Sequence, residues 1–130
     1  MATLFMTSRL PVSVEQAWRR VAAVDQVHDI LPVVTSCSFE GDQRACLLAN
    51  GAQLKEKIIS IDNDLKRLAY SVIDSPFGLE YHAASMQIVA DGQGSRIDWT
   101  TDFKPDHLKE ALTPMLEQMF AQMSERLSVA

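Results

Sequence analysis

The spacing of apolar and polar positions changes along this chain, and the changes predict its elements. Alternating residues predict a first strand at residues 3–10. Apolar residues at helical spacing follow, with Ser13 as a cap and Gln16 completing a Ser-x-x-Gln capping box. Asp25 can cap a second short helix at residues 26–31, which the next proline ends. The first part therefore predicts a strand followed by two short helices.

The middle of the chain alternates between β-rich runs and turn signals. The turn signals EGDQR, ANGA, DNDL, SPFG and DGQG occur at hairpin spacing. This spacing predicts an antiparallel meander of six strands, at residues 35–40, 44–49, 52–61, 65–73, 80–90 and 95–103.

The last part, residues 106–128, has a helical pattern that contains Pro114. Because an interior proline costs about 3 kcal/mol, we expect a short helix to Leu112 and a second helix with Thr113 as cap and Pro114 at its first position. Methionine fills irregular gaps in a core and also lines surfaces that accept ligands of variable shape. The apolar face of this region is rich in methionine, and consists of Leu112, Met115, Leu116, Met119, Phe120, Met123 and Leu127.

Together these elements predict an α+β protein of one domain, residues 1–130. A curved seven-stranded antiparallel sheet would wrap around a long C-terminal helix, with the two short helices between the first and second strands.

Turn lengths predict which residues share a face of the sheet, because a one-residue slip turns every side chain of a strand over. We assume a two-residue Asn-Gly turn, a three-residue turn at 62–64 and a four-residue turn at DGQG. The expected pairs are Leu47 with Leu54, Ala45 with Glu56, Glu56 with Tyr70, Ile58 with Leu68, Ile88 with Ile97 and Met86 with Trp99. The resulting inner face is mostly apolar, and comprises Leu47, Leu54, Ile58, Leu68, Tyr70, Val72, Met86, Ile88, Ile97, Trp99 and Phe103, with Glu56, His82 and Thr101 among them.

The two cysteines, Cys37 and Cys46, form no CxxC motif, which favours a reducing compartment. If the first hairpin closes over residues 41–43, Cys37 and Phe39 face inward and Cys46 faces outward, so a disulfide cannot form. A two-residue turn at 41–42 would instead place Cys37 opposite Cys46 and turn Phe39 outward. We expect the three-residue turn and free thiols.

Composition narrows the classes of function. The chain has 47% hydrophobic and 22% charged residues, which is typical of a globular domain. A net charge of −5 without a cluster of Lys and Arg argues against binding to nucleic acid. There is no apolar run of the ~18 residues that a membrane span needs, and no signal-peptide pattern. We therefore expect a cytoplasmic protein without integral membrane association.

The order and spacing of four segments carry a family resemblance. They are PVSVEQAWRRVAAVDQVHDILP, NGAQLKEKI, KRLAYSV and DGQGSRIDWTTDFKP. With these segments the chain resembles the START / polyketide cyclase-dehydrase-like (SRPBCC) superfamily, and most of all its small bacterial polyketide cyclase and lipid-transport group. The resemblance implies the helix-grip fold shared with birch-pollen-allergen-type proteins, with an apolar cavity between the concave sheet and the C-terminal helix. Because members include lipid carriers, ligand sensors and aromatase/cyclases, it implies a cavity rather than a reaction.

Two groups on the inner face are candidates for polar chemistry. Glu56 is expected opposite Tyr70 with no predicted cation nearby, so it can anchor a ligand or act as an acid or base with Tyr70. It can equally form a carboxylate–phenol hydrogen bond that only braces the sheet, or be solvated if the register slips. His82, near the end of its strand, can bind a ligand at the cavity mouth, act as an acid–base group, or be a satisfied rim residue.

The other candidates form an apolar cavity wall. Phe77 lies on the loop DSPFGLEY, which can gate the cavity or be an ordinary loop. The remaining candidates for ligand contact are Met86, Trp99, Met115, Met119 and Phe120. No cluster has metal-ligand spacing and no nucleophile or phosphate-loop motif is present, so we expect neither metal nor cofactor.

The sequence thus predicts binding or transport of a small hydrophobic molecule, whether lipid-, polyketide- or aromatic-like, by a monomer or homodimer. One alternative is a cyclase, dehydratase or aromatase that uses Glu56 or His82 as its acid–base group. Another is an accessory protein that acts through a protein partner.

Overall fold

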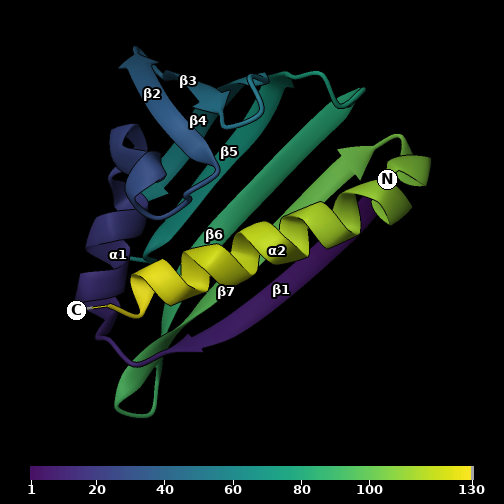
Figure 1. Cartoon of the computed structure of the whole chain (residues 1–130). Helices are drawn as coiled ribbons and strands as arrows, with labels where there is room; N and C mark the ends of the chain where they lie inside the picture. Colours follow the sequence, from purple (N-terminus) through teal and green to yellow (C-terminus); the bar gives the residue numbers. More distant parts are fainter. Residues whose placement is uncertain (130) are drawn as a thin grey trace.

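The fold is a single curved sheet with a long helix across its concave face (Figure 1). The computed structural model describes residues 1–129. The elements are β1 (Ala2–Leu10), α1 (Val14–Ala22), the 3-10 helix η1 (Val24–Asp29), β2 (Val34–Glu40), β3 (Gln43–Leu48), β4 (Gln53–Asp62), β5 (Arg67–Asp74), β6 (Tyr81–Asp91), β7 (Gly94–Lys104), the 3-10 helix η2 (Asp106–Leu108) and α2 (Lys109–Leu127).

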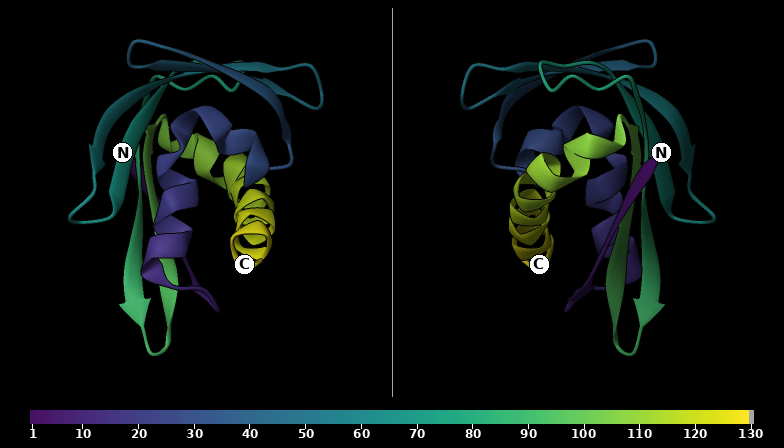
Figure 2. Two further views of the ribbon diagram at one scale, coloured as in Figure 1. Left: turned by 90° about the vertical axis from the view of Figure 1, so that its left-hand side faces the viewer. Right: turned by 90° about the vertical axis from the view of Figure 1, so that its right-hand side faces the viewer.

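The strands form one antiparallel sheet in the order β1-β7-β6-β5-β4-β3-β2. The sheet bends around the helices, and α2 lies within its curve (Figure 2). The α+β helix-grip architecture expected from the sequence is therefore confirmed.

Helix α1 begins as its capping residues predict. The Gln16 backbone N–H donates to Ser13 Oγ at 3.1 Å, and the Ser13 N–H donates to Gln16 Oε1 at 3.2 Å. Trp18 and Val21 are buried beneath the helix. The second short helix differs from its prediction, because η1 starts at Val24 and Asp25 does not cap it.

The predicted break in the last helix is wrong. Helix α2 continues through Pro114, and Thr113 donates its hydroxyl to the Lys109 carbonyl at 2.6 Å instead of capping a new helix. A continuous helix keeps Met123 and Leu127 buried on the face that carries its earlier apolar residues. Tertiary packing of that face offsets the local cost of the proline.

The hairpin of β6 and β7 has the predicted register. Met86 pairs with Trp99, Ile88 with Ile97, and Ala84 with Thr101. The inner positions of both strands are buried, as their alternation predicts. The sequence therefore placed the centre of the concave face correctly.

Strand β3 is one residue out of its predicted register. The loop 49–51 holds three residues, closed by the Leu48 N–H donating to the Ala52 carbonyl at 2.8 Å. The observed pairs are Arg44 with Glu56, Ala45 with Lys55, Cys46 with Leu54, and Leu47 with Gln53, so the predicted pairs Ala45–Glu56 and Leu47–Leu54 are wrong. Consequently Leu47, expected on the inner face, is 40% exposed, and Arg44 is buried.

The pairing of β4 with β5 is also shifted. Glu56 pairs with Val72 and Ile58 with Tyr70, because the loop 63–66 has four residues and the register shifts between Ile58 and Ser60. The predicted pairs of Glu56 with Tyr70 and Ile58 with Leu68 are therefore wrong. Glu56 and Tyr70 nevertheless remain on the inner face, 8% and 4% exposed.

The first hairpin adopts the tighter turn. Glu40 pairs with Gln43, leaving two turn residues, and Gly41 has the positive φ of 63° that L side chains rarely adopt. Cys37 then lies opposite Cys46, with the two Sγ atoms 2.6 Å apart. The thiols are free, as expected, but the prediction that Cys46 faces away from Cys37 is wrong.

Candidate functional site

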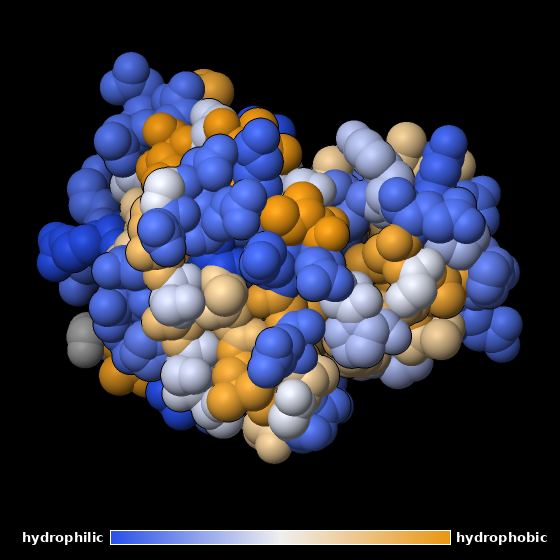
Figure 3. Space-filling view, turned by 90° about the horizontal axis from the view of Figure 1, so that it is seen from above, coloured by the Kyte–Doolittle hydropathy of each residue, from blue (hydrophilic) through white to orange (hydrophobic). Residues whose placement is uncertain are grey.

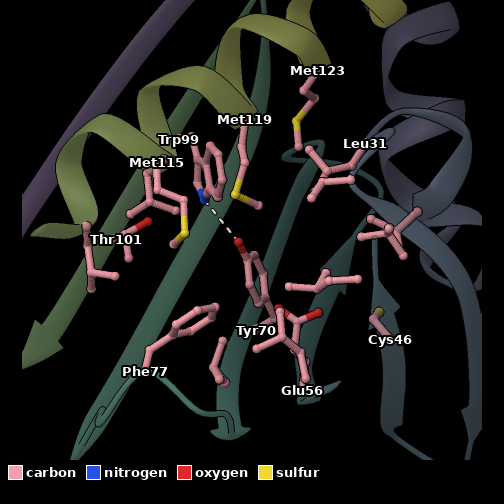
Figure 4. Close-up of a pocket in the computed structure, with 18 of the residues that line it drawn as sticks. Leu31, Cys46, Glu56, Tyr70, Phe77, Trp99, Thr101, Met115, Met119 and Met123 are labelled. Carbon is pink, nitrogen blue, oxygen red and sulfur yellow. Dashed lines mark hydrogen bonds between the residues drawn. The ribbon is translucent and has the colours of Figure 1, made fainter. Parts of the chain in front are cut away.

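A cavity of about 500 Å³ lies between the concave sheet and α2. Its wall comes from the inner faces of β3 to β7, the η1–β2 connection, the β5–β6 loop and α2. Most of the lining side chains are apolar. Figure 4 shows Met115, Met119 and Met123 reaching into this space from α2, opposite Tyr70 and Trp99.

Eight of the predicted site residues line the cavity: Glu56, Tyr70, Phe77, His82, Met86, Trp99, Met115 and Met119. Phe120 does not. It is buried and packs against Trp99 on the core side, with the ring centroids 5.9 Å apart. The structure thus brings the predicted residues together around one space, and their contact with a ligand stays a prediction.

A buried ion pair forms one side of the wall. Arg44 donates from Nε and Nη2 to the same oxygen, Glu56 Oε1, at 3.0 and 2.8 Å. Arg44 also donates from Nη1 to the Val24 carbonyl at 3.0 Å and lies over the Tyr70 ring, 5.6 Å from its centroid. Burial disfavours the guanidinium charge, but Glu56 and then Tyr70 outweigh that effect and raise the pKa of Arg44. Glu56 is therefore a paired carboxylate.

Tyr70 and Trp99 are joined by a hydrogen bond on the sheet side of the cavity. Trp99 Nε1 donates to Tyr70 Oη at 3.0 Å, which is the dashed line in Figure 4. Burial, reinforced by the charge of Glu56, raises the pKa of the Tyr70 hydroxyl. Tyr70 is therefore a neutral phenol whose oxygen already accepts one hydrogen bond and whose own proton remains available to donate.

His82 is fixed by a backbone contact. The Val72 N–H donates to His82 Nδ1 at 2.9 Å, and the Tyr70 and His82 rings are 5.8 Å apart. Burial lowers the pKa of His82 to about 4, although Asp102 opposes that shift. At neutral pH the imidazole is uncharged, and because Nδ1 accepts, its single proton is on Nε2.

Thr101 adds a polar group without a partner. Its side chain is 2% exposed and lines the cavity, and Oγ1 has no hydrogen-bond partner among the described residues. Buried hydroxyls almost always have a partner. A group from a ligand would satisfy this one.

Arg44 and Thr101 are two buried polar residues of the cavity wall that sequence reasoning did not name as candidates for ligand contact. Thr101 was placed on the inner face, and its polarity at an otherwise apolar position was a usable signal. Arg44 was hidden by the register error in β3, because the residues that follow it, ACLL, are apolar on both faces of the strand.

The cavity opens beside polar residues. Asn50 and Gln118 are exposed members of its wall, and Phe77 is half-buried in the β5–β6 loop. Seen from above, the molecule shows apolar atoms among polar ones in a hollow of its surface (Figure 3). This arrangement gives a small molecule a route from solvent to the interior.

The described residues contain neither a cluster of metal ligands nor a membrane-spanning helix. Within residues 1–129 no three His, Cys, Asp or Glu side chains are grouped as a metal site would need. No helix in the same part of the chain is long and apolar enough to cross a membrane.

Solved structures share this architecture. XoxI from Bacillus cereus matches with a TM-score of 0.89 and 19% identity, over 98% of this chain and 94% of that chain. A protein from Thermobifida fusca, determined in solution by NMR, matches with a TM-score of 0.82 and 23% identity, over 98% and 93% of the two chains. Norcoclaurine synthase from Thalictrum flavum, in complex with dopamine and hydroxybenzaldehyde, matches with a TM-score of 0.77 and 19% identity, over 98% and 84%. These likenesses establish the fold.

The family follows from a sequence comparison. The family model described as polyketide cyclase / dehydrase and lipid transport matches residues 1–128. That range holds the whole sheet, both 3-10 helices and α2. The chain belongs to the polyketide cyclase / dehydrase and lipid transport family.

Proposed function

We propose that this protein binds a small hydrophobic molecule non-covalently in the cavity between the sheet and α2. The observation that carries the proposal is an open, mostly apolar space of about 500 Å³ in the middle of the domain. Pockets of this size and lining are typical of small-molecule sites. Family membership supports a ligand-binding role.

The size of the cavity sets the size and affinity of the ligand. At the interior packing density of about 0.74, a space of about 500 Å³ holds about 370 Å³ of ligand. Burying about 400 Å² of apolar ligand surface contributes about 10 kcal/mol. Association costs at least about 4 kcal/mol, which leaves a dissociation constant of about tens of micromolar or weaker. Hydrophobic burial alone therefore suffices for a carrier or sensor.

The polar residues of the wall favour binding over acid–base catalysis. Glu56 is held in an ion pair with Arg44, and His82 uses Nδ1 to accept from the backbone. His82 is thus a hydrogen-bond donor at Nε2 and has no free basic nitrogen. A cyclase or dehydratase that uses either group as its base is accordingly the weaker alternative.

The methionines suit a ligand whose shape varies. Met115 and Met119 are only partly buried, so their flexible side chains can rearrange around different molecules. The norcoclaurine synthase complex, with its two small aromatic compounds, is consistent with such ligands in this fold. Within this proposal the protein acts as a monomer or homodimer in the cytoplasm, which its free thiols fit.

Binding of the neutral dye phenylnaphthylamine, followed by its fluorescence, tests this function. Leu116→Trp adds bulk to the cavity wall, whereas Leu65→Trp adds the same bulk at an exposed position that does not line the cavity. We expect the dye to bind the wild type and Leu65→Trp alike, and Leu116→Trp about tenfold more weakly or not at all. Equal binding by all three proteins would place the dye elsewhere and refute the proposal.

A further inference from the structure

The charges of the cavity wall cancel each other. Arg44 and Glu56 are the only Lys, Arg, Asp or Glu side chains among the described residues that line the cavity, and they are paired with each other. His82 is uncharged at neutral pH. A carboxylate on a ligand would lose its hydration in this medium of low dielectric and would find no free cation to replace it.

The neutral polar groups of the wall have hydrogens to donate. Tyr70 Oη accepts from Trp99, which leaves the phenol proton free. His82 accepts at Nδ1, which puts its proton on Nε2, and Nε2 has no partner among the described residues. Thr101 Oγ1 is buried in the wall with no partner in the same part of the chain.

The register of three strands gathers these groups. Ala84 on β6 pairs with Tyr70 on β5 and with Thr101 on β7, so Tyr70 and Thr101 flank it in one row across the sheet. Neighbouring strands lie about 4.8 Å apart, which puts the backbones of Tyr70 and Thr101 about 10 Å from each other. His82 follows on the same face of β6, two residues from Ala84.

We propose, resting on the ligand-binding function above, that the ligand is an uncharged apolar molecule with a carbonyl or hydroxyl oxygen, which accepts hydrogen bonds from Tyr70, His82 and Thr101. The apolar part of the molecule lies against Met115 and Met119. The Arg44–Glu56 pair stays intact and excludes acids such as free fatty acids. The cavity therefore selects ligands that carry no charge and have an oxygen that accepts hydrogen bonds, in addition to selecting them by shape.

Three probes of similar size test the two parts of this proposal, the hydrogen bonds to an oxygen and the selection for a neutral ligand. They are methyl naphthyl ketone, ethylnaphthalene and naphthoate. Their affinities are measured by quenching of tryptophan fluorescence at neutral pH. We expect the ketone to bind about tenfold more tightly than the hydrocarbon, as one or two hydrogen bonds would give. We expect naphthoate to bind more than about tenfold more weakly than the ketone.

Substitutions in the cavity wall test which side chains cause the preference for the ketone over the hydrocarbon. Thr101→Val removes one donor with little change of shape, and His82→Asn keeps an acceptor for the Val72 N–H but removes the Nε2 donor. Each should lower the ketone-to-hydrocarbon affinity ratio several-fold. Thr100→Val, one residue along β7 and outside the cavity wall, is the control and should leave the ratio unchanged. Glu56→Gln frees the charge of Arg44 and should raise the affinity for naphthoate by about tenfold or more.

The outcomes distinguish this inference from the function on which it rests. Equal affinities for the ketone and the hydrocarbon, or tight binding of naphthoate to the wild type, would overturn the inference and leave the ligand-binding function standing. Failure of all three probes to bind would overturn both. If Glu56→Gln does not fold, the ranking of the probes on the wild type and on Thr101→Val decides the question.

Discussion

Removing either member of the Arg44–Glu56 pair should destabilise the protein severely. The side chains are 4% and 11% exposed, so each single substitution leaves a charge or its hydrogen-bonding groups buried without a partner. Breaking such a pair costs about 3–5 kcal/mol, against a total stability of about 5–15 kcal/mol for a domain. Arg44→Met should cost more than Glu56→Leu, because Arg44 also donates to the Val24 carbonyl.

The double variant Arg44→Met/Glu56→Leu should be much less destabilised than the sum of the single variants. Replacing both charges by apolar groups of similar size leaves nothing unpaired, so we expect a coupling energy of at least about 2 kcal/mol. Urea unfolding, followed by circular dichroism, gives the free energies of unfolding for all four proteins of the cycle.

The exposed pair of Lys57 and Asp42 is the control. Its side chains are 53% and 58% exposed and its atoms are 3.9 Å apart, so Lys57→Met should cost less than about 1 kcal/mol. If Arg44→Met and Glu56→Leu also cost less than about 1 kcal/mol each, with no coupling, the pair is solvated. That result would refute the inward register of β3 and the neutral cavity that follows from it.

Three further predictions concern pH, the proline and the cysteines. Because burial lowers the pKa of His82 from 6.5 to about 4, the unfolded chain takes up this proton at higher pH than the folded chain. The free energy of unfolding should therefore fall by up to about 3 kcal/mol through His82 as the pH falls from 6.5 to about 4. In His82→Asn, urea unfolding at the same pH values should not show this part of the decrease. Pro114→Ala should raise the free energy of unfolding by about 1–3 kcal/mol, measured in the same way, because it restores a backbone donor inside α2. Burial is the main cause that raises the pKa of both Cys37 and Cys46, so iodoacetamide should alkylate them slowly at neutral pH and faster as the pH rises, measured by intact mass.

Each of these three predictions would be contradicted by one specific result. An unchanged pH dependence in His82→Asn would mean that the imidazole is solvated and charged. A loss of stability in Pro114→Ala would mean that the proline fits its place in α2 without cost. Rapid alkylation of Cys46 at neutral pH would contradict its burial.

The sequence predicted the helix-grip architecture because its strongest signals are local and agree with one another. The capping box at Ser13 fixed the start of α1. In β6 and β7 the turn length at DGQG and long, regular alternation agreed on the register that places Met86 beside Trp99. In β3 the residues 45–48 are apolar on both faces of the strand, so its predicted register rested on the assumed turn length alone. The loop 49–51 has one residue more than the Asn-Gly signal predicts, and that single residue turned Arg44 inward.

The candidate site was predictable in its apolar wall and unpredictable in its electrostatics. Met115, Met119 and Trp99 were placed by periodicities of 3.6 and 2, which follow from backbone geometry. The partner of Glu56 depended on the register of a neighbouring strand, which no local pattern decides. The break expected at Pro114 failed for a related reason, because local propensity is overridden when a whole helix face packs.

Native mass spectrometry of the gently purified protein, followed by organic extraction of any bound molecule, shows directly whether the cavity holds a ligand. We expect a stoichiometric excess mass, which extraction identifies as an uncharged apolar compound with a carbonyl or hydroxyl oxygen. A mass equal to that of the bare chain, with no uptake from a library of lipids and aromatic compounds, would contradict this expectation. The methionine-rich face of α2 would then be ordinary core packing.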